Sequence, residues 1–340
     1  MPLTAAVIGL SRYARDVHIP FLLSEPDVRL VAIAGSNPAR TGPPAGLDLP
    51  GVTHYSNYHA LLDAPATDFV IIASAPVPHY EQITACLEQG RHVLVDKAFV
   101  CSQAQAEAVV GLARAHALLL GVVVQRRYET AIRHLSETVR AGHIGKVRSV
   151  RANYARWYAK DANHWRNDPA VAWGGMLADN GYHLLDEMLW MAGLHPERVQ
   201  AELHNEGMAV EQTAALNIRF EGGAVGSVLA TYLAPRGFIR EEVFIHGTQG
   251  AVFFQRQQDP GGPLRAFVTH LDAQGQTQPV PPHEHTADRH APHHNFVQAL
   301  RGREDLLASG ADSIATVALI DAAYQSARNE KPQAIVYRAG

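Results

Sequence analysis

The first 124 residues alternate short, almost wholly apolar runs with stretches whose apolar residues recur at helical spacing. Continuous apolar runs are typical of strands buried on both faces, as in a parallel sheet. These runs predict strands at residues 4–10, 28–34, 69–73, 92–95 and 118–124. Helices fit between them, including one at 80–89 that ends at Gly90 and one that Ser102 caps. The alternation predicts an α/β domain with a doubly wound parallel sheet, which binds ligands at the carboxyl ends of its strands.

Beyond residue 124 the pattern becomes the alternation of apolar and polar positions that half-buried strands show. Strands are expected at residues 147–158, 198–206, 213–220, 224–233, 241–246 and 251–255. Glycine-containing hairpin signals at 221–223 and 247–250 separate neighbouring strands, and helices are expected at 131–140, from about Asp179 and at 311–329. The chain is therefore predicted to form two domains, 1–124 and 125–340. The second is α+β, with a mostly antiparallel sheet covered on one face by helices.

Composition excludes several classes of protein. Hydrophobic residues make up 47% and charged residues 18% of 340 residues, which is typical of a soluble globular protein. A formal net charge of -4 gives no basic field for nucleic acid or a membrane surface. Cys86 and Cys101 are too few for a disulfide scaffold, and a strand at 4–10 leaves no room for a signal peptide. We therefore expect a cytoplasmic protein without nucleic-acid or membrane partners.

The first apolar run ends in Gly9-Leu10-Ser11-Arg12-Tyr13-Ala14, and a helical stretch follows it as far as Leu23. Dinucleotide-binding proteins carry G-x-G-x-x-G/A here, because glycines permit a tight turn and let backbone amides approach a pyrophosphate. Ser11 stands for the second glycine and Ala14 for the third. The turn from Gly9 to Tyr13 is therefore a candidate cofactor site, although a plain strand–turn–helix would give much the same pattern.

The end of the second predicted strand bears on cofactor choice. NAD-binding domains place an acidic residue there, about 20 residues beyond the glycines, to bind the ribose 2′-hydroxyl. This chain has Gly35-Ser36-Asn37-Pro38-Ala39-Arg40 instead. No carboxylate would repel a 2′-phosphate, while Ser36 can donate a hydrogen bond and Arg40 supplies charge. The segment favours NADP over NAD, and the alternative is that Arg40 is a solvated loop residue.

Polar residues follow two further strands at the edge where ligands are expected. Ser74 follows the third, with His79 at the start of the next helix, and Asp96-Lys97-Ala98 follows the fourth. A partly desolvated amine at Lys97, near a nicotinamide ring, can exchange a proton with a substrate hydroxyl. The alternative is a surface lysine in a loop.

A second candidate for proton transfer lies in the segment 173–187, Trp-Gly-Gly-Met-Leu-Ala-Asp-Asn-Gly-Tyr-His-Leu-Leu-Asp-Glu. On a helix, Asp179, His183 and Asp186 stand at i, i+4 and i+7 and share one face. An apolar stripe at 184–192 would anchor that helix, and rigidly held acid and imidazole groups suit proton transfer. The alternative is that Asp179 caps the helix and His183 is an ordinary polar residue.

Two clusters of ring side chains each allow more than one interpretation. The aromatic and hydrogen-bonding cluster just ahead of this segment suits a wall for a sugar, with strand packing as the alternative. Its members are Tyr154, Trp157, Tyr158, His164 and Trp165. A histidine-rich loop before a helix at Asn295 lacks the fixed spacing of a metal site, so no metal is predicted. Its members are His283, His285, His290, His293 and His294.

Taken together, these motifs resemble the glucose–fructose oxidoreductase, inositol dehydrogenase and MocA (Gfo/Idh/MocA) family. The likeness runs through nearly the whole chain. It is carried by the Gly9 turn with 18–20, by 72–74 with His79, by 90–97, 125–128, 165–166 and 174–186, and by 295–296 and 299–302.

The resemblance implies a Rossmann domain at 1–124, a substrate-binding and oligomerisation domain at 125–340, and a nicotinamide-dependent oxidoreductase acting on a sugar, polyol or related compound. The family's proton-transfer and substrate-orienting residues fall on Lys97, Asp179 and His183. Its cofactor contacts fall on the Gly9 turn, Ser36, Ser74, His79, Asp96, Gln125, Trp165 and Arg166. We expect NADP, with NAD as the alternative, and a homodimer or homotetramer.

Four positions depart from the family's motifs: Asp96 replaces Glu and Ala98 replaces Pro of E-K-P, Trp173 replaces the first of three glycines, and Pro76 replaces an Asn. Because Lys97, Asp179 and His183 remain, these changes bear on substrate shape and loop geometry more than on hydride transfer. Two other functions stay open: a glycosidase that uses its nicotinamide transiently, as some relatives do, and a non-catalytic dinucleotide-binding regulator.

Overall fold

The computed structural model describes residues 1–35, 49–158, 164–280 and 288–337, which form two compact units. The first unit comprises Met1–Gln125 and Arg289–Ile314, and the second comprises Arg126–Asp288 and the chain from Ala315. The predicted boundary after residue 124 thus lies one residue from the observed one. The segment 289–314, which the sequence placed in the second domain, instead belongs to the first unit.

The first unit is built on a six-stranded sheet in which every pair of neighbouring strands is parallel. The strand order is β3-β2-β1-β4-β5-β6, as expected of a doubly wound sheet. The strands are β1 (Leu3–Ile8), β2 (Val28–Ala34), β3 (Thr53–Tyr55), β4 (Phe69–Ile72), β5 (His92–Asp96) and β6 (Leu120–Val123). The apolar runs predicted each of these strands except β3, whose three residues are too short to show a pattern.

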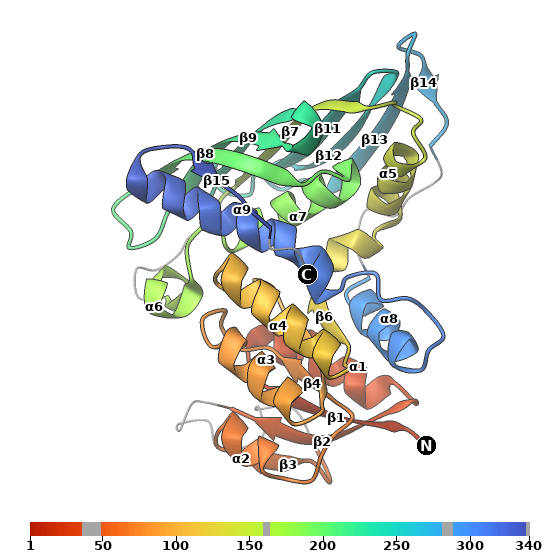
Figure 1. The fold of residues 1–340 in the computed structure, drawn as a ribbon, viewed down its shortest axis with the longest axis vertical. Helices are drawn as coiled ribbons and strands as arrows, with labels where there is room; N and C mark the ends of the chain where they lie inside the picture. The colour runs from red at the N-terminus through yellow and green to blue at the C-terminus, as the bar shows by residue number, and fades with distance from the viewer. Residues whose placement is uncertain (36–48, 159–163, 281–287, 338–340) are drawn as a thin grey trace. The chain divides into compact units, whose positions relative to one another are not determined.

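Helices flank this sheet (Figure 1): η1 (Ala14–His18), α1 (Ile19–Ser24), α2 (Tyr58–Leu62), α3 (His79–Glu88), α4 (Gln103–Ala115) and α8 (Ala291–Leu300). The predicted cap of α4 is confirmed, because the Ser102 side chain accepts a hydrogen bond from the Gln105 amide. In return, the side chain of Gln105 accepts a hydrogen bond from the Cys101 amide. Helix α8 begins at Ala291, whereas its predicted start was Asn295, so His293 and His294 lie inside the helix.

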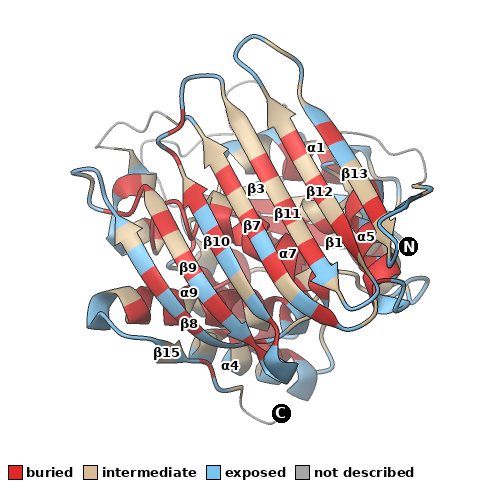
Figure 2. Ribbon diagram, turned by 90° about the horizontal axis from the view of Figure 1, so that it is seen from above, coloured by how far each residue is buried: buried red, intermediate tan, exposed pale blue. Residues whose placement is uncertain are grey.

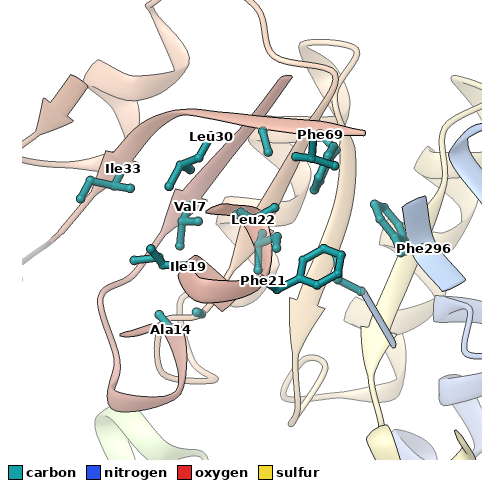
Figure 3. Close-up of a cluster of buried hydrophobic side chains, with 14 of the residues drawn as sticks. Val7, Ala14, Ile19, Phe21, Leu22, Leu30, Ile33, Phe69 and Phe296 are labelled. Atoms are coloured by element: carbon teal, nitrogen blue, oxygen red, sulfur yellow. The ribbon is translucent and has the colours of Figure 1, made fainter. Parts of the chain in front are cut away.

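The late segment joins the first unit because it completes that unit's hydrophobic core (Figure 3). The ring of Phe296 on α8 lies 5.7 Å from that of Phe69 on β4, and both side chains are fully buried. Farther along, the carbonyl of Ala308 accepts a hydrogen bond from the amide of Val122 on β6. The sequence does not show this packing, because the apolar pattern of α8 does not indicate which strands the helix contacts.

The second unit contains a nine-stranded sheet in the order β14-β13-β12-β11-β7-β10-β9-β8-β15. Only β7 and β10 pair in parallel, so the prediction of a mostly antiparallel sheet is confirmed. The strands are β7 (Val147–Arg156), β8 (Pro196–His204), β9 (Thr213–Phe220), β10 (Val225–Thr231), β11 (Ile239–Gly247), β12 (Gly250–Gln258), β13 (Arg265–Asp272), β14 (Thr277–Gln278) and β15 (Gln333–Ala334). Both predicted hairpins are present, while β13, β14 and β15 were not predicted.

Helices cover one face of this sheet, and Figure 2 looks onto the other face, which is open. The helical elements are η3 (Gln125–Tyr128), α5 (Thr130–Arg140), η4 (Trp165–Asn167), α6 (Pro169–Ala172), α7 (Asn180–Ala192), η5 (Glu221–Gly223) and α9 (Gly310–Asn329). Helix α9 starts in the first unit and continues into the second. Along β10 the side chains alternate between exposed and buried, so the sheet has one apolar face and one face toward solvent.

Buried ion pairs hold helix α7 against the start of the second unit. Arg127 donates two hydrogen bonds to Asp186, of 2.8 and 2.6 Å, and both side chains are 2% exposed. Thr316 adds a third donor to the same carboxylate, at 3.3 Å. The neighbouring Arg126 lies 2.9 Å from Glu187, whose pKa burial raises above its ordinary value. Asp186 is therefore a structural partner of Arg127.

Within the described part of the chain, no helix has the length and apolarity that a membrane-spanning segment needs.

Candidate functional site

In the first unit, the turn after β1 is the candidate dinucleotide site. Gly9 has φ of +90°, a conformation that residues with a side chain rarely adopt, and an added Cβ would lie 2.5 Å from the Ser74 nitrogen. The Ser11 hydroxyl oxygen accepts a hydrogen bond from the Ala14 amide at 3.1 Å. A glycine is thus needed at the first position, while Ser11 fits the second and caps the following helix.

Replacing Gly9 by alanine is expected to weaken cofactor binding at least tenfold, because the new methyl group would push the turn away from Ser74. Gly51 provides the matched control: its φ is +76°, yet an added Cβ meets nothing within 4 Å. Gly51→Ala therefore shares the backbone strain of about 1 kcal/mol without the clash. Fluorescence titration of both variants with NADPH measures the difference, and equal affinities would contradict the assignment of this turn.

The other predicted contacts in this turn differ in exposure. Arg12 is exposed, and its Nε lies 3.1 Å from the Asp16 carboxylate, whereas Leu10 is half-buried. Tyr13 is also half-buried, with its ring edge-on to His18, and burial raises the pKa of Tyr13 to about 12. The predicted NADP-selective residues, Ser36, Asn37 and Arg40, lie outside the described residues.

Ser74 and His79 connect the ends of β4 and β5. The Ser74 hydroxyl donates to Gln82 at 2.6 Å. His79 is fully buried, with Nδ1 2.9 Å from the Ala98 carbonyl oxygen and Nε2 3.2 Å from that of Ser74. Burial lowers the pKa of His79. The His79 ring thus lies between the main-chain oxygens of Ser74 and Ala98 and connects the end of β4 to the loop that follows Lys97.

Asp96 ends β5 and Lys97 follows it, and both are half-buried at the carboxyl edge of the sheet. The Asp96 carboxylate lies 3.2 Å from Nε2 of His18, a buried residue of η1. The structure therefore places Ser74, Asp96 and Lys97 at the strand ends where the sequence predicted them. Gln125, the last residue before the chain enters the second unit, begins η3.

The start of α7 in the second unit holds the other predicted proton-transfer residues. Asp179 lies just before the helix and makes no side-chain cap to it. Instead, its carboxylate accepts a hydrogen bond of 2.7 Å from the Tyr232 hydroxyl and lies 3.3 Å from Nε of Arg166. Asn180 donates to the same hydroxyl at 2.7 Å, and His183 is buried one turn on. The alternative of a simple helix cap is therefore wrong for the Asp179 side chain.

Tyr232 is a site residue that the sequence did not indicate. Its side chain is 1% exposed, and burial beside Asp179 raises its pKa well above the ordinary value, so it stays a hydrogen-bond donor. It follows β10 and lies 53 residues from Asp179 in sequence, so their contact depends on the tertiary fold. A lone tyrosine at a strand end gives no signal of that role.

Glu211 fixes the glycine-rich segment before α7. Its buried carboxylate accepts hydrogen bonds from the amides of Gly175 and Leu177, at 2.9 and 2.8 Å, and from the Tyr324 hydroxyl at 2.9 Å. An added Cβ at Gly175 would collide with the Glu211 carbonyl oxygen. Burial raises the pKa of Glu211. Trp173, which replaces a glycine of the family motif, has φ of +70° and packs edge-on against Tyr324.

The predicted aromatic wall divides by exposure. Tyr154 is 3% exposed within β7, as ordinary strand packing would place it. Trp157 and Trp165 are 38% and 40% exposed, and the Arg166 guanidinium lies 4.4 Å from the Trp165 ring centre. The ring of His164 stacks on the ring of Trp165, with 5.9 Å between the ring centroids. The surface available to a ligand is therefore that of Trp157, His164 and Trp165.

Of the predicted histidine-rich loop, His283 and His285 lie outside the described residues. Among the residues that the structure describes, no group of three or more His, Cys, Asp or Glu side chains could hold a metal ion.

Comparison with known proteins identifies both units. The model described as "Oxidoreductase family, NAD-binding Rossmann fold" matches residues 3–124, and that of the "GFO/IDH/MocA C-terminal domain" matches residues 132–253. An uncharacterized oxidoreductase of Schizosaccharomyces pombe is 29% identical over 60% of this chain. That match spans only 55% of the relative's length.

Two further matches cover more of the chain. The 1,5-anhydro-D-fructose reductase of Ensifer adhaerens is 27% identical over 76% of this chain and 77% of its own length. The WlbA dehydrogenase of Bordetella pertussis, solved with NADH and UDP-GlcNAcA, superposes with a TM-score of 0.84 at 22% identity. That likeness covers 99% of this chain and all of the other, and it shows a common fold.

Proposed function

Because the chain belongs to the Gfo/Idh/MocA family of oxidoreductases, we propose that it transfers hydride between NADP(H) and a hydroxyl or carbonyl group of a sugar, polyol or related molecule. The observation that carries this proposal is that both family domains match a chain that retains Lys97, Asp179 and His183. The name of the Ensifer adhaerens relative, a reductase of an anhydro sugar, supports a carbohydrate-like substrate.

Each residue has a chemical role in this proposal. The turn from Gly9 to Tyr13 holds the cofactor's pyrophosphate, for which a tight approach of backbone amides is needed. When bound, the nicotinamide supplies the hydride acceptor in the oxidative direction. Lys97 or His183 accepts the proton of the reacting hydroxyl. Asp179, which Tyr232 and Arg166 hold in place, keeps His183 in the productive tautomer.

Exposure of the aromatic side chains supports a place for the substrate. Trp157 and Trp165 offer ring faces that pack on the apolar faces of sugars, and His164 offers a polar ring edge for hydroxyl groups. Ser74, His79, Asp96, Gln125, Trp165 and Arg166 remain proposed cofactor contacts on the strength of the family's motif alone.

The direct test is a spectrophotometric screen of sugars, polyols and their keto or aldehyde forms with NADP(H) and NAD(H). Appearance or loss of the reduced ring's absorbance on at least one substrate is the expected result. Release of sugar without accumulation of reduced cofactor would instead identify a glycosidase. No turnover on any compound, with intact dinucleotide binding, would favour a non-catalytic regulator.

Cofactor choice is expected to depend on Arg40. Replacing Arg40 by alanine should raise the Kd for NADPH about tenfold and leave that for NADH unchanged, because only NADPH carries the 2′-phosphate that an arginine can bind. Parallel fluorescence titrations measure both constants, with Arg303→Ala as a control for an exposed arginine elsewhere in the first unit. An equal effect on both cofactors would contradict NADP selectivity at this loop.

The open face of the nine-stranded sheet is the proposed site of homodimer or homotetramer formation (Figure 2). Val225 and Leu229 on β10 and Phe267 on β13 are 46 to 50% exposed there, and a groove of about 770 Å³ lies on the same face. Exposed apolar patches commonly mark protein interfaces. Sedimentation should give a dimer or tetramer mass, which Leu229→Glu shifts toward the monomer. A wild-type chain that sediments as a monomer would contradict the proposal.

The chain's two cysteines support a reducing compartment such as the cytoplasm. Neither Cys86, which is buried, nor Cys101, which is half-buried, forms a disulfide, as is usual where glutathione keeps thiols reduced.

A further inference from the structure

Two buried histidines lie behind Asp96 in the first unit, and neither belongs to the site described so far. Nδ1 of His18 lies 2.6 Å from Nε2 of His293, and Nε2 of His18 lies 3.2 Å from the Asp96 carboxylate. His18 is fully buried and His293 is 1% exposed. Three segments distant in sequence, η1, α8 and the end of β5, thus form one line of polar groups that ends beside Lys97.

The number of protons on each side chain determines which group donates each of these hydrogen bonds. The Asp96 carboxylate can only accept, so His18 donates to it through Nε2–H. With Nδ1 as its acceptor, His18 then receives a hydrogen bond from Nε2–H of His293. This arrangement leaves Nδ1 of His293 without a proton, and that atom is buried with no partner among the described residues. If His18 carried both protons, His293 would have to bear its proton on Nδ1, as a buried donor with no acceptor.

The surroundings favour the neutral form of His293. Burial lowers the pKa of His293 well below the ordinary value, and the neighbouring His18 and His290 lower it further. The ring of Phe21 packs 4.9 Å from that of His293. Other titratable or charged groups lie on the packed elements. Arg15 and Asp16 are on η1, Tyr13 has the Arg289 guanidinium over its ring, and His294 lies 3.2 Å from Glu25.

We propose that His18 and His293 are positioning residues that act through Asp96, holding its carboxylate in one orientation at the strand end so that its second oxygen can bind a hydroxyl group of the cofactor's ribose. This inference rests on the proposed function, in which Asp96 contacts the dinucleotide. The structure shows no side-chain partner for the second oxygen, Oδ2, among the described residues. Asp96 is also one methylene shorter than the family's glutamate. A fixed orientation reduces the number of conformations in which its carboxylate points away from the ligand.

A role in packing alone would not need this arrangement. Apolar side chains of similar size would fill the space between η1 and α8 without burying polar nitrogens, which is costly unless every proton finds an acceptor. Here each buried N–H that the assignment requires has one, and the chain of acceptors ends on the Asp96 carboxylate at the ligand-binding edge. The buried hydrogen bonds of His293 and His18 therefore lead to the Asp96 carboxylate.

Paired substitutions at His293 separate positioning from packing. His293→Gln keeps a terminal N–H donor for His18, while His293→Leu removes it and keeps comparable bulk. We expect His293→Leu to raise the cofactor Kd and KM about tenfold with kcat changed less than about threefold, and His293→Gln to stay within about threefold of wild type. His294→Leu, on the same helix with its side chain half exposed, is the control and should match wild type. Equal losses in the Gln and Leu variants, or none in Leu, would overturn the proposal.

A second measurement needs neither cofactor nor substrate. Proton–nitrogen correlation spectra of ¹⁵N-histidine-labelled protein at neutral pH should show both His18 and His293 as neutral Nε2–H tautomers, assigned by the peaks missing from His18→Gln and His293→Gln. A doubly protonated His18, or a proton on its Nδ1, would overturn the proposal. If both tautomers are as expected and the cofactor Kd responds as above while no sugar or polyol is turned over, the proposed function fails and the positioning role stands.

Discussion

Replacing Lys97 by alanine is expected to lower kcat/KM about 10³-fold while the cofactor Kd changes less than about threefold, since positioned acid–base groups contribute about 10² to 10⁴ in rate. His183→Ala should behave alike. Both side chains are proposed to exchange the proton of the reacting hydroxyl, which the cofactor alone cannot accept. Steady-state kinetics on the best substrate of the screen and titration with NADPH give the two quantities.

Exposed residues of the same types provide the controls. Lys146→Ala and His204→Ala remove an exposed amine and an exposed imidazole in the second unit, away from α7, and should leave kcat/KM unchanged. A loss of cofactor affinity that equals the loss of kcat/KM would show that Lys97 or His183 binds the dinucleotide rather than moving a proton. That outcome would reassign their roles.

Arg127→Met is expected to destabilise the protein by about 3 to 5 kcal/mol, because it removes both arginine donors from the buried Asp186 carboxylate and leaves it the weaker hydrogen bond of Thr316. Helix α7 carries Asp186, so the loss should also loosen the helix on which His183 lies. Urea unfolding followed by circular dichroism measures the change in stability of the second unit.

The comparison variant is Arg303→Met, which breaks a pair whose arginine side chain is 56% exposed. Exposed pairs contribute little, so its unfolding midpoint should match that of wild type. A midpoint for Arg127→Met close to that of the control would contradict a structural role for the buried pair. The double variant Arg127→Met/Asp186→Leu should recover much of the loss, because it leaves no buried charge unpaired.

Patterns local in sequence predicted most of the fold. The apolar runs of β1, β2, β4, β5 and β6 each carry their own evidence of burial on both faces, and Ser102 and Gln105 specify the cap of α4 within four residues. The membership of α8 in the first unit could not be predicted, because it depends on Phe296 meeting Phe69, more than 200 residues away. Strand β13 escaped prediction because exposed and buried positions alternate only in part of it.

The same distinction holds for the candidate site. Lys97, Asp179 and His183 lie in motifs that a sequence displays, and the structure places them at a strand end and at the start of a helix. Tyr232 and Glu211 hold Asp179 and the segment before α7 through long-range hydrogen bonds, which leave no local pattern in the sequence. The motif also could not indicate that the buried ring of His79 lies against the main-chain oxygens of Ser74 and Ala98.

The central proposal is that Lys97 and His183 both serve proton exchange with the reacting substrate hydroxyl. Comparing kcat/KM of Lys97→Ala, His183→Ala and the double variant tests it most directly, because groups that act as a unit have non-additive effects. We expect the double variant to be about as slow as the slower single variant. A loss equal to the product of the two single losses would contradict a shared site.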